Sequence, residues 1–174
     1  MIENQRFLMI VESTADIIFE IDVHRRFVAV FGKGLEKINK TAKDFIGKTV
    51  VEVFGDDGID RDRSYKRALE GENIFYDWEI NTDKETLYFE SSIAPIYNEK
   101  GNIIGAVGVT RDITEPKKRQ AEIEYISIHD FLTGLHNRRY FGDMLEKLNK
   151  PEYYPLAVVM VDLNGLKIIN DAFG

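Results

Sequence analysis

The chain has 174 residues, of which 44% are hydrophobic and 30% are charged, a composition typical of a soluble globular protein. It contains no cysteine, which excludes disulfide bonds and thiol chemistry, and its net charge of −7 argues against nucleic-acid binding. Because no apolar run approaches the roughly 20 residues of a membrane-spanning helix, we expect a cytoplasmic protein with no membrane segment in this chain.

The first 71 residues are predicted to form two strands and several helices. Residues 4–13 are amphipathic at helical spacing, and residues 17–21 and 27–31 have the composition of strands joined by a polar turn. Short helical pieces follow at residues 35–39, 42–46 and 50–54. Residues 60–71 indicate a longer helix that ends at Gly71, a residue suited to the left-handed conformation after a helix.

Charged residues crowd the start of this longer helix. The run contains, in order, Asp56, Asp57, Asp60, Arg61, Asp62 and Arg63. Because arginines interrupt the carboxylates and the spacing of an EF-hand is absent, we interpret the run as a solvated loop rather than a calcium site.

Three further strands are predicted at residues 73–81, 86–97 and 102–113, joined by short polar turns. The last strand contains Gly105 and Gly108, which have no side chain, so a large group is expected to approach the backbone there. The element order predicts an α+β fold with a five-stranded antiparallel sheet covered on one face by helices.

Three short motifs strengthen one family resemblance. They are Gly-x-Gly-Leu at 32–35, Phe-Ile-Gly-Lys-Thr at 45–49 and Asp-Ile-Thr at 112–114. With the element order, they resemble the PAS family of sensory domains. The resemblance implies that residues 1–114 form a PAS-like domain, which in this family often holds a ligand between sheet and helices.

The candidate pocket residues of this domain are Tyr76, Trp78, Phe89 and Ser91. Absence of cysteine excludes a covalent flavin adduct. The resemblance implies that a haem ligand would lie on helix 60–71, and none of the three histidines (His24, His129 and His136) is there, which argues against haem. Non-covalent flavin, a small carboxylate and an acyl chain stay open, so the ligand is unknown. We favour the interpretation that these aromatic side chains fill the core.

Residues 115–128 are predicted to form a linker helix, with Thr114 as N-cap. The spacing of Ala121, Tyr125 and Ile128 resembles a short coiled-coil stripe. Two interpretations stay open: a helix that rests on its own sheet, or a dimer interface that transmits a signal. We expect a homodimer through the PAS-like domain and this helix.

The C-terminal segment opens with a specific motif. Residues 130–139 match Asp-x-Leu-Thr-Gly-Leu-x-Asn-Arg-Arg, which resembles the start of the GGDEF family of bacterial diguanylate cyclases. Residues 155–161 form an apolar run that fits a strand buried on both faces and ends at Asp162. The resemblance implies that Asp162 and the backbone carbonyl of Leu163 bind Mg²⁺ in the intact cyclase domain.

By the same resemblance, Lys167 contacts phosphate and Asn170 reads the guanine of GTP. The motif Gly-Gly-Asp/Glu-Glu-Phe, which names the family, does not occur in the chain. We therefore expect residues 129–174 to be a truncated N-terminal part of a GGDEF domain, an α/β segment without a complete catalytic site. Residues beyond about 150 are expected to be poorly ordered or to lean on another surface.

The pattern as a whole predicts a regulatory module of bacterial signal transduction. In this interpretation a PAS-like sensor and a linker helix control cyclic di-GMP synthesis from GTP by a longer, diguanylate cyclase-type protein, while this chain alone is inactive. The alternative is a ligand-free PAS dimerisation module of a degenerate cyclase or of a cyclase–phosphodiesterase.

Overall fold

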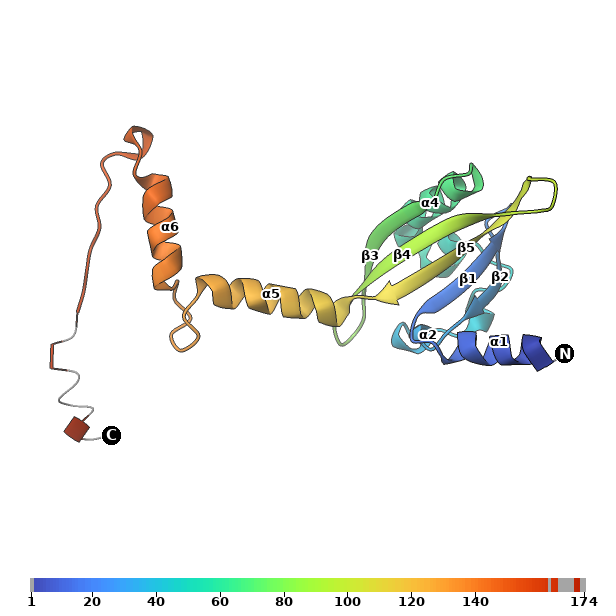
Figure 1. Cartoon of the computed structure of the whole chain (residues 1–174), viewed down its shortest axis with the longest axis horizontal. Coiled ribbons are helices and arrows are strands. Elements are labelled where there is room, and N and C mark those ends of the chain that lie inside the picture. Colours follow the sequence, from blue (N-terminus) through green and yellow to red (C-terminus); the bar gives the residue numbers. More distant parts are fainter. Residues whose placement is uncertain (1, 163, 166–170, 173–174) are drawn as a thin grey trace. The chain divides into compact units, whose positions relative to one another are not determined.

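Figure 1 shows the computed structural model of the chain, which describes residues 2–162, 164–165 and 171–172. The chain divides into two compact units, residues 1–120 and 121–174. Within the described residues, no helix is both long and apolar enough to cross a membrane.

The first unit is built on a five-stranded sheet. Its strands are β1 (Ile17–Asp22), β2 (Phe27–Phe31), β3 (Ile74–Asn81), β4 (Thr86–Tyr97) and β5 (Ile103–Asp112). Neighbouring strands are antiparallel, and their order across the sheet is β2-β1-β5-β4-β3 (Figure 1). The prediction of a five-stranded antiparallel sheet is therefore confirmed.

Short helices connect β2 to β3 and supply the other half of the core. They are α2 (Gly34–Lys37), η1 (Ala42–Asp44), α3 (Val50–Phe54), η2 (Gly55–Gly58) and α4 (Ile59–Leu69), and α1 (Ile2–Ser13) precedes the sheet. Alternate residues of β1 face these helices, as the period of a strand requires. The buried cluster includes Ile17, Phe19 and Ile21 from the sheet and Leu35, Phe45, Val50, Tyr65 and Ala68 from the helical side.

Two local features fix the ends of the helices. Thr49 and Glu52 form a capping box at the start of α3, in which each side chain accepts from the backbone of the other. Gly71, with φ of +102°, follows the cap of α4, and the amides of Gly71 and Glu72 donate to the carbonyls of Ala68 and Arg67. This is the Schellman arrangement, so the predicted end of the helix at Gly71 is confirmed.

The close approach predicted at Gly108 is made by an aromatic ring. A Cβ atom at Gly108 would lie 2.2 Å from Cζ of Phe19 on the neighbouring strand β1, and one at Gly105 would lie 2.4 Å from the carbonyl oxygen of Ile21. Glycine at these positions lets β1 and β5 pair while the Phe19 ring lies over the backbone of β5.

Helix α5 (Thr114–Ile128) leaves the sheet unit directly after β5, and the turn at 129–137 leads into α6 (Arg138–Leu148), which η3 (Pro151–Tyr153) follows. The turn is held by side chains of the sequence motif. Asn137 caps α6 by accepting from the amide of Tyr140, and Asp130 accepts from the amide and hydroxyl of Thr133.

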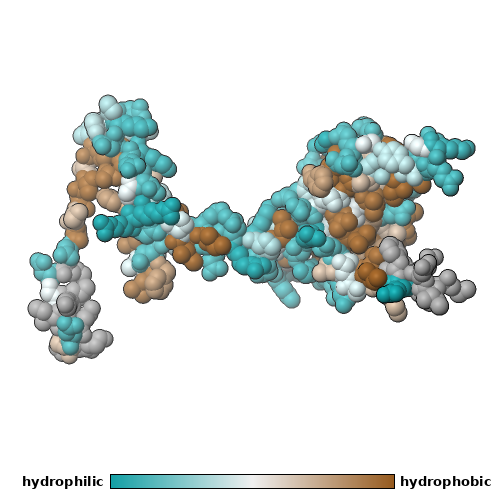
Figure 2. Space-filling view, viewed as in Figure 1, coloured by the Kyte–Doolittle hydropathy of each residue, from teal (hydrophilic) through white to brown (hydrophobic). Residues whose placement is uncertain are grey.

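The strand predicted at residues 155–161 does not form. Figure 2 shows the run as a hydrophobic stretch open to solvent, and Val159, Met160 and Val161 are 84% to 90% exposed. No strand of the described residues pairs with it. A strand buried on both faces needs neighbours on both sides, and without them the pattern of the sequence has nothing to pack against.

Candidate functional site

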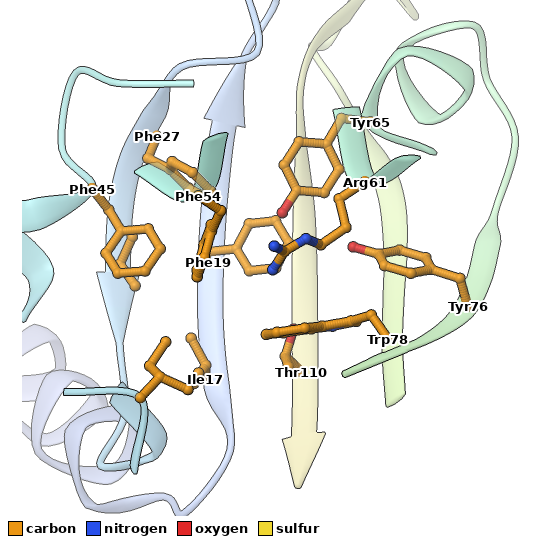
Figure 3. A pocket seen from close by; sticks show the side chains of 12 residues that line it. Ile17, Phe19, Phe27, Phe45, Phe54, Arg61, Tyr65, Tyr76, Trp78 and Thr110 are labelled. Carbon is orange, nitrogen blue, oxygen red and sulfur yellow. The ribbon is translucent and has the colours of Figure 1, made fainter. Parts of the chain in front are cut away.

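A small cavity lies between the sheet and the helices of the first unit (Figure 3). Its volume is about 20 Å³, room for about one water molecule. Most of its walls are aromatic, with rings from β1, β2, β3 and the helical segment, and two polar side chains join them, Arg61 and Thr110. The cavity therefore combines an apolar lining with a few polar groups, as small-molecule sites do.

Arg61, in the first turn of α4, is only 5% exposed. Its guanidinium carbon lies 4.0 Å from the ring centroid of Phe54 and 4.2 Å from that of Trp78. Nε and Nη2 donate to the carbonyl of Asp57 at 3.3 and 3.1 Å, and no carboxylate of the described residues forms an ion pair with this arginine. Burial lowers the pKa of Arg61 from its ordinary value.

Hydroxyl groups lie in the walls of the cavity and directly behind them. The indole Nε1 of Trp78 donates to Oγ of Ser91 at 2.8 Å, and Oγ of Ser91 lies 2.7 Å from Oγ1 of Thr110. Tyr65 is buried, and burial raises its pKa well above the ordinary value of 10.0. Burial also raises the pKa of Tyr76. Both tyrosines are therefore neutral near pH 7, with O–H groups able to donate hydrogen bonds.

The four pocket residues expected from the sequence gather around the indole of Trp78. Tyr76 and Trp78 line the cavity, whereas Phe89 and Ser91 lie behind them. Phe89 stacks on Trp78 with ring centroids 4.5 Å apart, and Ser91 accepts its hydrogen bond. The sequence thus located one wall of the cavity.

Sequence reasoning missed the opposite wall, above all Arg61, Tyr65 and Phe54. The interpretation of the charged run as a solvated loop is wrong for Arg61, which is buried, and for Asp60 and Asp62, which are in α4. Arg61 and Tyr65 are four residues apart and so share one face of the helix. That spacing was the available signal.

Of the candidate cyclase residues, one lies within the described part of the chain. Asp162 is exposed. Leu163, Lys167 and Asn170 lie outside the described residues. His24 is exposed in the turn between β1 and β2, where its amide donates to the carboxylate of Asp22.

Comparison with known families agrees with this architecture. Residues 11–118 match the PAS fold family. The chain belongs to the PAS family. Residues 127–174 match the family described as diguanylate cyclase, GGDEF domain. Both resemblances inferred from sequence motifs are confirmed.

Solved structures show the same fold in the PAS part. A PAS domain from Colwellia psychrerythraea is 24% identical with a TM-score of 0.52, over 66% of this chain and 99% of that one. The PAS domain of BvgS from Bordetella pertussis is 23% identical with a TM-score of 0.50, over 71% of this chain and 96% of that one. At these identities the likeness concerns the fold alone.

Two curated relatives extend the comparison, one of them over nearly the whole chain. The probable diguanylate cyclase DgcE of Escherichia coli is 26% identical over 180 residues, which is 99% of this chain and 16% of that protein. The cyclic di-GMP phosphodiesterase PdeB of Shewanella oneidensis is 35% identical over 85 residues, which is 49% of this chain and 10% of that protein. The chain thus spans a small part of each.

Proposed function

We propose that this chain is the sensory and linking part of a bacterial diguanylate cyclase-type protein. In it, a PAS domain of residues 1–114 controls cyclic di-GMP synthesis from GTP through a linker helix of residues 115–128. The observation that carries the proposal is the succession of a PAS match and a GGDEF match, joined by one helix, α5. Similarity to a probable diguanylate cyclase and to a cyclic di-GMP phosphodiesterase supports it.

The start of α5 supports a coupling role for the linker. Lys117 pairs with Asp77 of β3 at 3.1 Å, and Lys118 pairs with Glu85 in the β3–β4 turn. The hydroxyl of Thr114 accepts from the amide of Tyr88 in β4 at 2.9 Å. A movement of β3 or β4 caused by a ligand would therefore reach the first turn of the helix directly.

For the second unit we propose the roles that the GGDEF family assigns. In the intact domain, the carboxylate of Asp162 and the carbonyl of Leu163 hold Mg²⁺, Lys167 contacts phosphate, and Asn170 reads guanine. Oxygen ligands of this kind suit Mg²⁺. Because the 174 residues contain no Gly-Gly-Asp/Glu-Glu-Phe motif, we propose that residues 129–174 are catalytically incomplete and that this polypeptide alone does not turn over GTP.

We place the parent protein in the cytoplasm. Because two GTP molecules must meet for the reaction, we propose that it is a homodimer that aligns two cyclase domains. A second candidate function is a ligand-free PAS dimerisation module of a degenerate cyclase or of a cyclase–phosphodiesterase. The observation behind this second function is the small volume of the cavity, about 20 Å³ when none of its side chains is displaced.

The test compares this chain with the longer protein that continues it through a complete GGDEF motif. Both are incubated with GTP and Mg²⁺, and cyclic di-GMP is quantified by chromatography. We expect product from the longer protein and none from the 174-residue chain. Absence of product from the longer protein favours the degenerate cyclase, and product from the short chain contradicts the proposed incompleteness.

A further inference from the structure

Arg61 is the feature of the PAS core that apolar packing does not explain. A guanidinium stays protonated at neutral pH, and burying a charge is costly unless it is paired and hydrogen-bonded. Here it meets two aromatic faces and one carbonyl, without a carboxylate partner among the described residues. The positive charge is therefore only partly balanced within the protein.

Arg61 lines the cavity, and part of its guanidinium makes no hydrogen bond to the described residues. Its five N–H donors form a planar fork, and the hydrogen bonds found for it use only Nε and Nη2. No buried polar side-chain atom of the described residues lacks a hydrogen-bond partner, so Nη1, which makes none of these bonds, is accessible to water. Figure 3 shows the guanidinium above the plane of Trp78, within the ring of side chains that line the cavity.

We propose that the cavity of the PAS domain binds a small monocarboxylate, whose oxygens take hydrogen bonds from Arg61 and from the nearby hydroxyls of Tyr65, Tyr76 or Thr110. A single cation in the pocket matches a single negative charge. The planar fork of arginine suits the planar carboxylate group, which can accept two parallel hydrogen bonds. That this carboxylate acts as a signal rests on the function proposed above, whereas its binding does not.

The walls of the cavity determine the polarity and size of the group that can be attached to the carboxylate. They are aromatic and aliphatic, so the tail attached to the carboxylate is apolar. The cavity of about 20 Å³ holds about one water molecule, so a carboxylate and its tail fit only when side chains of the lining move. Phe54 and Trp78 are partly exposed, whereas the aromatic side chains of Phe19, Phe27 and Tyr65 are buried. We therefore expect the side chains of Phe54 and Trp78 to move and make room for the tail of the ligand.

Trp78 is the only tryptophan of the chain, so a movement of its side chain on ligand binding would change the fluorescence of the protein. The purified 174-residue chain is titrated with sodium acetate, butyrate, hexanoate and benzoate at constant ionic strength, and tryptophan fluorescence is followed. Butyramide and benzamide are the matched neutral probes. We expect a saturable change with at least one carboxylate and affinity at least tenfold lower for its amide.

Two variants on the same helix test the assignment. Arg61→Gln removes the charge, and we expect at least a tenfold loss of carboxylate affinity. Arg63→Gln is the matched control, since Arg63 is exposed and pairs with Asp60, and it should bind as the unchanged chain does. If Arg61→Gln does not fold, as judged by near-ultraviolet circular dichroism, the ¹⁵N resonance of Nε in Arg61 of the unchanged chain must shift on titration.

Three results would overturn the proposal: no saturable change with any carboxylate, equal affinity in the folded Arg61→Gln variant, or chloride and phosphate binding as tightly as the carboxylates. None of these measurements uses GTP. Failure here therefore leaves the proposed control of cyclic di-GMP synthesis untouched, and failure of the GTP assay leaves this site untouched.

Discussion

At the scale of single residues, the hydroxyl of Ser91 joins the polar groups on the sheet side of the PAS core. It is fully buried on β4, accepts from the indole of Trp78 on β3 and shares a hydrogen bond with Thr110 on β5. One side chain therefore links three neighbouring strands beneath the cavity. Buried polar groups are costly when they lose their partners, so this link is expected to contribute to stability.

Replacing Ser91 with alanine leaves the indole N–H of Trp78 and the hydroxyl of Thr110 without this partner. We expect the free energy of unfolding to fall by about 1–3 kcal/mol, the usual cost of an unsatisfied buried polar group. Urea unfolding of the purified chain measures it. The control is Ser92→Ala, on the opposite face of β4, which should change stability by less than about 0.5 kcal/mol. Equal effects of the two changes would contradict the assigned role.

The cavity shows what residue patterns predict and what they conceal. Tyr76 and Trp78 are two residues apart on β3 and so share one face, because successive side chains of a strand point to opposite faces. Arg61 was missed because carboxylates flank it in the sequence, and charged residues are rarely buried. Its position at helical spacing with Tyr65 and Ala68, both buried, is the physical reason that it faces the core.

At the scale of elements, the junction of β5 and α5 is held by Asp112. Its carboxylate accepts from the amide of Thr114 at 2.8 Å and pairs with Lys37 of α2. Burial alone would raise the pKa of Asp112, but the hydrogen bonds from Lys37 and Thr114 outweigh burial and lower it below its ordinary value of 3.8. A depressed carboxylate pKa stabilises the fold above the pKa of the unfolded chain.

Asp112→Asn should therefore destabilise the chain by about 1–2 kcal/mol at pH 7, because a charged hydrogen-bond acceptor is replaced by a neutral one. This difference from the unchanged chain should shrink as the pH falls through and below the folded-state pKa, where the carboxylate is itself protonated. Urea midpoints at pH 7 and pH 3 measure both values. Asp60→Asn is the control, since Asp60 is exposed and its pair with Arg63 contributes little. A pH-independent difference would contradict the charge-based account.

Element prediction succeeded where the described residues supply a pairing partner and failed where they do not. The hairpin strands β3, β4 and β5 follow one another, so their pairing partners are supplied by the next short turn. The apolar run at 155–161 has the composition of a buried strand, but no paired strand lies within the described residues. Composition sets the preference of a segment, and neighbours decide whether the strand forms.

At the scale of the whole molecule, the boundary between the two units falls inside α5, between Gln120 and Ala121. The sequence predicted this helix and the PAS and GGDEF parts on either side of it. The predicted stripe of Ala121, Tyr125 and Ile128 describes its apolar surface incompletely. Tyr125 stacks on His129 with ring centroids 4.0 Å apart, and other apolar side chains of the helix are left exposed.

The exposed apolar side chains of α5 bear on the expected homodimer. Ile123 and Ile126 are 63% and 55% exposed and lie three residues apart, which places them on one side of the helix. Burying an isoleucine contributes about 1.5–3 kcal/mol, so a partner helix that covers both would stabilise a dimer appreciably. Sedimentation equilibrium of the 174-residue chain should therefore show a dimer.

The double change Ile123→Lys and Ile126→Lys should raise the dimer dissociation constant more than about tenfold, since each 1.4 kcal/mol is a factor of about ten. Glu122→Ala, at an exposed polar position of the same helix, should leave it unchanged. A monomeric unchanged chain would contradict the dimer itself. A double variant that dimerises normally would instead move the interface away from α5 to the PAS domain, because the rest of the predicted dimer surface lies there.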